Sequence, residues 1–312
     1  MKIIIFEEFI MRILISGGTG LIGKALVKSL TRAGDMVIIL TRDKSGKVDS
    51  TSIQYIEWDT KSREGLISII ENVDAVINLA GERIGSGFWT RSKKERIIES
   101  RVLAGSSLTE AILKASKKPG IFIQASGVGF YGTSLDQTFI EESLNGNDYL
   151  SEVARKWEDS SHALDSIGVR RVIIRTGVVL DAGSGALPLM VLPFRFFVGG
   201  PLGSGRQFIS WIHLEDEIRA IEFALRNPNI IGALNLTSPE VTNSEFGQVI
   251  GRVLHKPFWF PTPAFGLKLI LGEKSTLVLD GQRVIPKKLT EFGFKFKYSD
   301  LESALKDILN SN

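Results

Sequence analysis

Three glycines spaced three residues apart, Gly17, Gly20 and Gly23, constrain this chain more than any other feature of its sequence. They stand in the segment GGTGLIG, residues 17–23, directly after an apolar run and directly before a helical pattern. Such a loop permits a tight turn, brings a ligand close to the backbone and lets a helix pack closely on a strand. This position predicts that a diphosphate binds at the helix N-terminus. A purely structural turn is the alternative.

Short apolar runs rich in Ile and Val alternate with helical patterns in the first half of the chain, which is typical of strands buried on both faces. We predict strands over residues 12–16, 36–40, 53–57, 75–79, 121–125, 172–175 and 233–236, and helices around residues 22–30, 107–116 and 215–226. The alternation favours an α/β fold, a Rossmann-type doubly wound parallel sheet with a smaller, interleaved C-terminal lobe.

The pattern changes after about residue 180, where Gly, Pro and aromatic residues indicate loops with short elements. We therefore expect a Rossmann domain over residues 11–180, with 206–238 returning to it. Residues 181–205 and 239–312 are expected to form a substrate-binding lobe.

The end of the second predicted strand bears on the choice of cofactor. An NAD-binding chain usually carries an acidic residue about 20 residues past the loop. Here Arg42 stands 19 residues after Gly23. Because arginine binds a 2′-phosphate through two hydrogen bonds, the sequence favours NADP(H). Asp43 is close enough that NAD is not excluded, and a solvated loop charge is the alternative for Arg42.

Two further segments fit a dinucleotide site. Residues 78–81, NLAG, end the fourth predicted strand with small residues that allow a cofactor to approach the backbone. Asp59 follows the third predicted strand and is a candidate for the adenine amine, with a simple turn residue as the alternative.

Composition excludes several classes of function. The chain has no cysteine, so thiolate catalysis, disulfides and thiolate metal sites are absent, and its three histidines lack ligand spacing. A net charge of +3 without a basic block does not indicate nucleic-acid binding. No apolar run reaches about 18 residues, so we expect no membrane partner. The first ten residues make a poor secretion signal and suggest an extension before Met11, so a cytoplasmic protein is expected.

Taken in order, GGTGLIG, NLAGERI, SGVGFYG, GSGRQFISWIHLED and GQRVIPKKLTEFGFKF resemble the extended short-chain dehydrogenase/reductase superfamily. The closer resemblance is to an atypical branch whose members are labelled epimerase-like proteins or cell-division inhibitor homologues. It runs from about Met11 to Leu309. It implies a Rossmann domain that holds NADP(H), a C-terminal substrate lobe and, as an open alternative, a homodimer. The implied cofactor contacts are Gly17, Gly20, Leu21, Ile22, Gly23, Thr41, Arg42, Leu79, Ala80, Gly81, Arg101 and Val179. A surface charge is the alternative for Arg101.

Ordinary members of that superfamily use a Tyr-x-x-x-Lys pair on one helix face, in which the lysine lowers the pKa of the tyrosine. Here the helix reads DYLSEVARKWED, and the two positions fall on Leu150 and Ala154 or, one residue earlier, on Tyr149 and Val153, so neither register gives the pair. Replacement candidates are Tyr149, Glu82 and Ser126. Packing is the alternative for Tyr149, and backbone capping is the alternative for Glu82.

In the second lobe, the resemblance places Arg206, Trp211 and His213 at the substrate pocket. An arginine there suits an anionic ligand, whereas core packing is the alternative for Trp211 and a structural histidine for His213. Two functions follow: an NADP(H)-dependent oxidoreductase or epimerase acting on a small carbonyl or sugar-type substrate, or a non-catalytic NADP(H)-binding regulator of a partner protein. The first is favoured.

Overall fold

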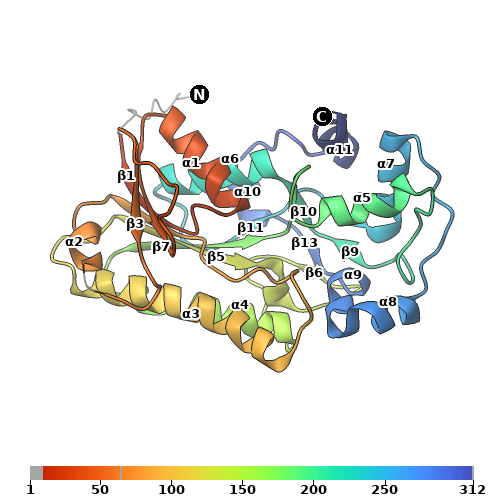
Figure 1. Cartoon of the computed structure of the whole chain (residues 1–312), viewed down its shortest axis with the longest axis horizontal. Helices are drawn as coiled ribbons and strands as arrows, with labels where there is room; N and C mark the ends of the chain where they lie inside the picture. The colour runs from red at the N-terminus through yellow and green to blue at the C-terminus, as the bar shows by residue number, and fades with distance from the viewer. Residues whose placement is uncertain (1–9, 64, 311–312) are drawn as a thin grey trace.

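The computed structural model describes residues 10–63 and 65–310. The expectation about an N-terminal extension concerns residues outside this part of the chain. Figure 1 shows a central sheet with helices on both faces and a second lobe beside it. The strands of the central sheet are β1 (Arg12–Ser16), β2 (Met36–Thr41), β3 (Ile53–Glu57), β4 (Ala75–Asn78), β5 (Ile121–Gly127), β7 (Arg170–Thr176) and β11 (Gly232–Leu236).

All neighbouring strands of this sheet are parallel, in the order β11-β7-β5-β4-β1-β2-β3. The chain reverses its direction of travel through the sheet between β1 and β4. In an open parallel sheet, a ligand binds at the carboxyl ends of the strands at that reversal. The predicted Rossmann-type α/β fold is confirmed.

Helices on the two faces explain why the strands are apolar throughout. On one face, α1 (Leu21–Arg32) and α6 (Leu214–Arg226) pack on Ile13 and Ile15 of β1. On the other face, α2 (Leu66–Ile70) and α3 (Arg91–Lys114) pack on Leu14. Successive residues of β1 therefore enter two different cores, as the period of two requires.

The second lobe has its own core. It is built from α5 (Leu187–Arg195), α7 (Asn243–Leu254) and α11 (Leu301–Asn310).

The remaining elements of the described chain, in either lobe, are β6 (Thr138–Phe139), β8 (Val178–Leu180), β9 (Phe208–Ile209), β10 (Trp211–His213), β12 (Val241–Thr242), β13 (Arg283–Val284), α4 (Tyr149–Asp159), α8 (Ala264–Leu271), α9 (Thr276–Leu279), α10 (Lys287–Glu291), η1 (Val128–Tyr131), η2 (His162–Ser166) and η3 (Gly272–Ser275). Between the segments of the second lobe, the chain returns to the Rossmann part through α6 and β11.

One helix is much longer than the sequence pattern predicts. The helix expected over residues 107–116 begins at Arg91, where the Thr90 side chain accepts a hydrogen bond from the Lys93 amide at 3.2 Å. The first half of α3 buries polar side chains, Lys93 and Arg101, on its inner face. Buried polar residues do not produce the apolar periodicity on which the prediction depended. Similarly, the segment expected to be mainly loop after residue 183 contains the helix α5.

Within residues 10–63 and 65–310, no helix combines the length and the apolar character needed to cross a bilayer. The same part of the chain has no group of three or more His, Cys, Asp or Glu side chains arranged to hold a metal ion.

A buried ion pair fixes α4 to the sheet. The Arg175 guanidinium of β7 donates to both carboxylate oxygens of Glu158, at 2.9 and 2.8 Å. Both side chains are almost fully buried. Ser126 of β5 donates a third hydrogen bond to the same carboxylate, at 2.7 Å. The pair therefore joins α4 to two adjacent strand ends.

Glu158→Gln is expected to destabilise the fold, because it leaves the Arg175 charge buried without a counter-ion. We expect the free energy of unfolding in urea to fall by about 3 kcal/mol. The matched control is Asp159→Asn, one residue away, whose pair with Arg155 lies in solvent. The control is expected to change the free energy of unfolding by less than about 0.5 kcal/mol. Equal effects of the two substitutions would contradict this role for Glu158.

Candidate functional site

The glycine loop leaves a bare helix N-terminus at the carboxyl edge of the sheet. Gly17 has φ +77°, and a Cβ there would lie 2.6 Å from the carbonyl carbon of Leu79. A Cβ on Gly23 would lie 2.3 Å from the Gly17 oxygen, whereas one on Gly20 would meet only that same oxygen, at 3.3 Å. Gly20 is the N-cap of α1 and supplies no side-chain cap. The first amides of α1, from Leu21 to Gly23, therefore have no intrahelical partner and suit an anion.

Hydrogen bonds between buried side chains hold the strand ends at one level. Ser16 Oγ, at the end of β1, donates to Asn78 Oδ1 at the end of β4. The Asn78 amide donates in turn to Gln124 of β5 at 3.1 Å. All three side chains are buried. This chain of contacts fixes where Leu79, Ala80 and Gly81 leave the sheet.

Arg42 follows the end of β2, next to the glycine loop. Ser16 and Leu40 are opposite one another in the paired strands, so Arg42 and Gly17 leave the sheet side by side. Arg42 is exposed and makes no hydrogen bond or ion pair with any other residue of the described chain. The Asp43 carboxylate instead accepts the Ser45 amide at 2.7 Å, and hydrogen bonds from the side chain and the amide of Ser45 lower the pKa of Asp43. The buried Thr41 hydroxyl donates to the Asp43 carbonyl at 2.9 Å.

Asp59 closes a turn after β3. One oxygen of its carboxylate accepts the amides of Lys61 and Ser62, at 2.8 and 2.6 Å, and these bonds lower its pKa. This is the turn role that the sequence left open. An adenine contact through Asp59 stays a prediction.

Arg101 is a buried cation that makes no direct ion pair with another described residue, although the charge of Glu82 attracts it. Its guanidinium donates to the carbonyls of Glu82 and Ile97, at 3.0 and 2.9 Å, and lies 4.6 Å from the centre of the Trp157 ring. Its Nε has no partner among the described residues. Burial lowers its pKa to about 10, so the group stays protonated at neutral pH. A Cβ on Gly81 would lie 3.0 Å from the guanidinium carbon, which places Arg101 directly beside the NLAG segment.

Val179 of β8 packs against the core of the central sheet. A Cβ on Gly185 would lie 3.4 Å from the Val179 carbonyl and 3.8 Å from the Leu21 side chain. The segment after β8 therefore passes over the start of α1, which places Val179 near the glycine loop.

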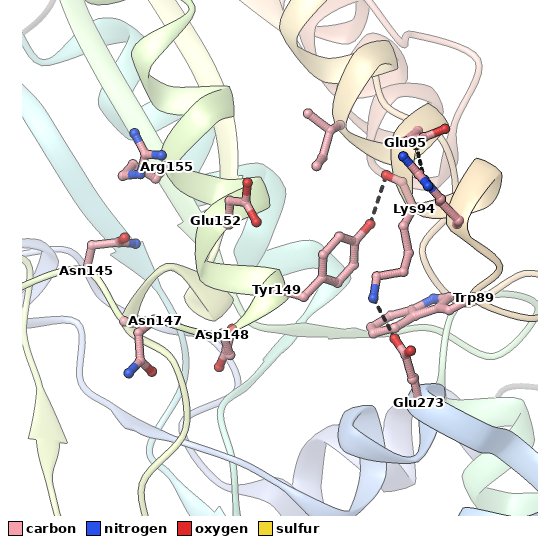
Figure 2. Close-up of a pocket in the computed structure, with 13 residues that line it drawn as sticks. Trp89, Lys94, Glu95, Asn145, Asn147, Asp148, Tyr149, Glu152, Arg155 and Glu273 are labelled. Carbon is pink, nitrogen blue, oxygen red and sulfur yellow. Dashed lines mark hydrogen bonds and ion pairs between the residues drawn. The ribbon is translucent and has the colours of Figure 1, made fainter.

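Tyr149 is hydrogen-bonded to α3, near enough to Arg101 for the two side chains to interact electrostatically. Figure 2 shows its hydroxyl directed at α3, where it donates to the Lys94 carbonyl at 3.0 Å. Its ring contacts Trp89 edge-on, with 5.1 Å between ring centres. Burial raises its pKa to about 12. These residues, with Glu152 and Glu273, line a polar cavity of about 690 Å³ between α3, α4 and η3.

The other two catalytic candidates are also engaged. Glu82 accepts a hydrogen bond from Lys93 Nζ at 2.6 Å, and this contact lowers its pKa, so the carboxylate is charged at neutral pH. Ser126 is buried and donates to Glu158. Neither side chain is poised as an acid or a base in this conformation. The pairing partners Lys93 and Glu158 were missed by the sequence reasoning, because nothing in the spacing links them to their partners.

The three substrate candidates are dispersed. Trp211 is 0% exposed and its Nε1 donates to the Pro239 carbonyl, so it packs in the second-lobe core. His213 caps α6 by accepting the Glu215 amide at 3.1 Å, and its ring stacks on Tyr298. These are the structural roles that the sequence left as alternatives, and a substrate contact gains no support from them. Arg206 alone is exposed to solvent.

Comparisons with known proteins agree with this geometry. Residues 13–157 match the model of the NAD dependent epimerase/dehydratase family, and residues 262–308 match a domain of unknown function, DUF1731. The epimerase family protein YfhF of Bacillus subtilis is 43% identical over 303 residues, covering 96% of this chain and 98% of the relative. The epimerase family protein SH2119 of Staphylococcus haemolyticus is 40% identical over 301 residues, covering 96% of this chain and 99% of the relative. The chain belongs to this epimerase family. The resemblance predicted from the motifs is confirmed.

Solved structures extend the likeness of this epimerase-family protein. A crystal structure of the human epimerase family protein SDR39U1 with NADPH has a TM-score of 0.87 at 33% identity, covering 97% of this chain and 100% of that one. UDP-glucose 4-epimerase of Thermotoga maritima, solved with UDP-glucose, has a TM-score of 0.76 at 18% identity, covering 96% and 98%. The second likeness shows the fold alone.

Alanine at Gly23 and alanine at Gly20 are expected to lower the free energy of unfolding by different amounts. Gly23→Ala forces its Cβ into the Gly17 carbonyl and should lower the free energy of unfolding by about 2 kcal/mol. Gly20→Ala has ordinary φ, −76°, and more open space, so we expect a change below about 1 kcal/mol. Urea unfolding of both variants measures this difference. A Gly20→Ala variant as unstable as Gly23→Ala would show that the loop lacks an open side for a ligand.

Proposed function

We propose that this epimerase-family protein binds NADP(H) at the glycine loop and acts as an oxidoreductase or epimerase on a small carbonyl or sugar-type substrate. The observation that carries the proposal is the pairing of an uncapped α1 N-terminus with an unpartnered arginine, Arg42, on the neighbouring strand end. The free amides suit the diphosphate and Arg42 suits the 2′-phosphate. The human relative solved with NADPH supports the same choice of cofactor.

The residues of the crevice fit such a dinucleotide. Gly17 and Gly23 are places where a side chain would collide with backbone, while the backbone around Gly20 is open. In this proposal the backbone of Leu79, Ala80 and Gly81 lies along the cofactor, and Val179 lies toward its nicotinamide. When bound, the nicotinamide supplies or accepts a hydride.

Arg101 is proposed to do the work of the missing lysine. In our interpretation, Leu150 and Ala154 occupy the positions of the Tyr-x-x-x-Lys pair, and Ala154 is buried and small. The Arg101 guanidinium lies over Trp157, one helical turn further along the same helix. It is a cation beside Gly81 with an unused donor, which suits a ribose hydroxyl or an anionic group of the ligand.

Proton exchange with the substrate would need a change in side-chain pairing. Tyr149 has its proton committed to the Lys94 carbonyl, and Glu82 is held as a charged carboxylate by Lys93. Ser126 is bonded to Glu158. A bound substrate would have to replace one of these contacts before that group could give or take a proton.

Because the Tyr149, Glu82 and Ser126 side chains are all hydrogen-bonded within the protein, a second function is also supported: a non-catalytic NADP(H)-binding regulator that acts through a partner protein. We further propose a cytoplasmic location and a homodimer. To separate the two functions, NADPH oxidation is followed with a panel of carbonyl compounds and sugar nucleotides. Turnover with any member supports the enzyme. No turnover, together with capture of a partner only in the presence of NADPH, supports the regulator.

Arg42→Ala is expected to weaken NADPH binding about 10- to 100-fold and to leave NADH binding nearly unchanged, since only NADPH carries the 2′-phosphate. Fluorescence titration of the purified protein with each cofactor measures both affinities. Lys44→Ala is the control, because Lys44 is already paired with Asp49 at 3.1 Å. An equal loss for both cofactors would place Arg42 elsewhere than at the 2′-phosphate.

Arg101→Met is expected to weaken NADPH and NADH binding alike, by about tenfold, because it removes a contact common to both cofactors. The free energy of unfolding without cofactor should stay the same or rise, since the buried charge has no carboxylate partner. Arg91→Met, on the exposed first turn of the same helix, is the control. A loss of stability with unchanged affinity would assign Arg101 a purely structural role.

A further inference from the structure

Large apolar side chains gather, unusually exposed, at the end of the second lobe. Figure 1 shows α5, the segment before α8 and α8 itself at the end of the molecule far from α2. The exposed fractions of these side chains lie between 42% and 85%. We call this set the aromatic end; its members are Leu189, Leu192, Phe196, Phe197, Val198, Trp259, Phe260, Phe265, Leu269 and Ile270.

Backbone contacts make the aromatic end continuous. The amides of Trp259 and Phe260 both donate to the Gly199 carbonyl, at 2.9 and 3.0 Å. The Trp259 indole donates to the Phe197 carbonyl at 2.9 Å. The two segments are thus held side by side, and α8 begins at Ala264, four residues after Phe260.

The helix α8 has the composition of a core helix without a core around it. Its sequence is AFGLKLIL, and none of its eight residues is buried. Phe265 and Leu269 are four residues apart and share one face, with Ile270 next to it. Large apolar side chains gathered and exposed in this way are a feature of interaction sites.

The two segments that carry the aromatic end hold basic but no acidic residues, and the acidic residues beside them include Glu273, just after α8, and Glu302, paired with Arg252. Residues 182–214 and 246–272, which contain the whole set, include no Asp or Glu, although the chain has 35 of them. The basic side chains in these two segments are Arg195, Arg206, Arg252, Lys256 and Lys268. Lys256 lies with its Nζ 3.8 Å from the centre of the Phe197 ring, so charge and aromatic surface are interleaved.

A cavity of about 630 Å³ adjoins the aromatic end. Arg252, His255 and Lys256 line it together with Phe258. Arg252 is paired with Glu302 at 3.1 Å, while Lys256 faces the aromatic ring of Phe197. The cavity is a polar, cationic recess beside an apolar surface, which is the arrangement that a phosphate headgroup and its acyl chains require together.

We propose that the aromatic end is a docking surface for an anionic phospholipid bilayer, on which the protein lies without spanning it. Trp and Phe side chains with interspersed Lys and Arg are the composition of interfacial membrane binding. A second copy of the chain is disfavoured as the occupant, because it would bring a second mainly basic surface against the first. The proposal goes beyond the cofactor site and does not depend on it. The expectation of no membrane partner depended on the lack of a spanning segment, which does not bear on a protein that lies on the surface of a bilayer.

The full chain offers its own fluorescent reporter. Of the five tryptophans, Trp259 is 64% exposed, Trp89 is half-buried, and Trp58, Trp157 and Trp211 are buried. With vesicles of phosphatidylglycerol and phosphatidylcholine, we expect the protein to co-sediment and its emission to shift to shorter wavelength. Pure phosphatidylcholine vesicles should give neither effect, and added salt should weaken the binding. Trp259→Phe should keep the binding and lose most of the shift.

Variants test whether the aromatic end is the contact. Phe260→Ser with Leu269→Ser, and separately Lys256→Glu with Lys268→Glu, should each lower the partition coefficient roughly tenfold or more. The matched control is Leu144→Ser, an equally exposed leucine outside the set, which should bind as the unaltered chain does.

Three results would overturn the proposal. The first is no co-sedimentation of the unaltered chain with anionic vesicles. The second is equal loss of binding in the control and the aromatic-end variants. The third is a dimer in sedimentation velocity that Phe260→Ser with Leu269→Ser dissociates, because the surface would then be an interface between copies. Because Phe260, Leu269 and Lys268 are exposed and Lys256 is only half-buried, the unfolding midpoints of the variants should match that of the control, and this check separates loss of binding from loss of fold.

Discussion

The close approach of Gly17 to the Leu79 backbone is the contact on which the crevice depends. A single methyl group at Gly17 would collide with the chain leaving β4. The hydrogen bonds from Ser16 through Asn78 to Gln124 keep the two strand ends at that separation. Because β1 and β4 are the strands between which the sheet order reverses, this one contact sets the width of the ligand crevice.

The central sheet could be predicted from the sequence because its signals are local. Each strand is an apolar run covered on both faces, and the turn after β1 requires glycine for its positive φ. The first half of α3 could not be predicted in the same way. It packs Lys93 and Arg101 inward, where they bind Glu82 and its carbonyl, so its buried face carries charge. Periodicity of apolar residues does not register such a face.

The cofactor candidates and the catalytic candidates differ in the same way: the first depend on local sequence signals and the second on partners that are remote in the sequence. Cofactor candidates such as Gly20, Arg42 and Ala80 follow strand ends directly, so topology alone brings them to one edge of the sheet. The catalytic candidates depend on side-chain partners remote in the sequence, as Ser126 depends on Glu158, 32 residues away. Spacing along one chain holds no information about which partner a hydroxyl or carboxylate takes. Pairing therefore had to come from the structure.

In the proposed function, Arg101 connects the stability of the chain to the occupancy of the cofactor site. Burial of a guanidinium without a direct ion pair costs free energy, which the two carbonyl contacts and the Trp157 ring offset in part. A ligand that brought a hydroxyl or an anionic oxygen to the unused Nε would reduce this cost in the folded state alone. Since a ligand that binds only the native state raises the free energy of unfolding, the position that destabilises the empty fold would also strengthen ligand binding. A lysine on α4, as in ordinary members of the superfamily, would meet the same requirement from the neighbouring helix, and in one register of that helix its place falls on the small, buried Ala154.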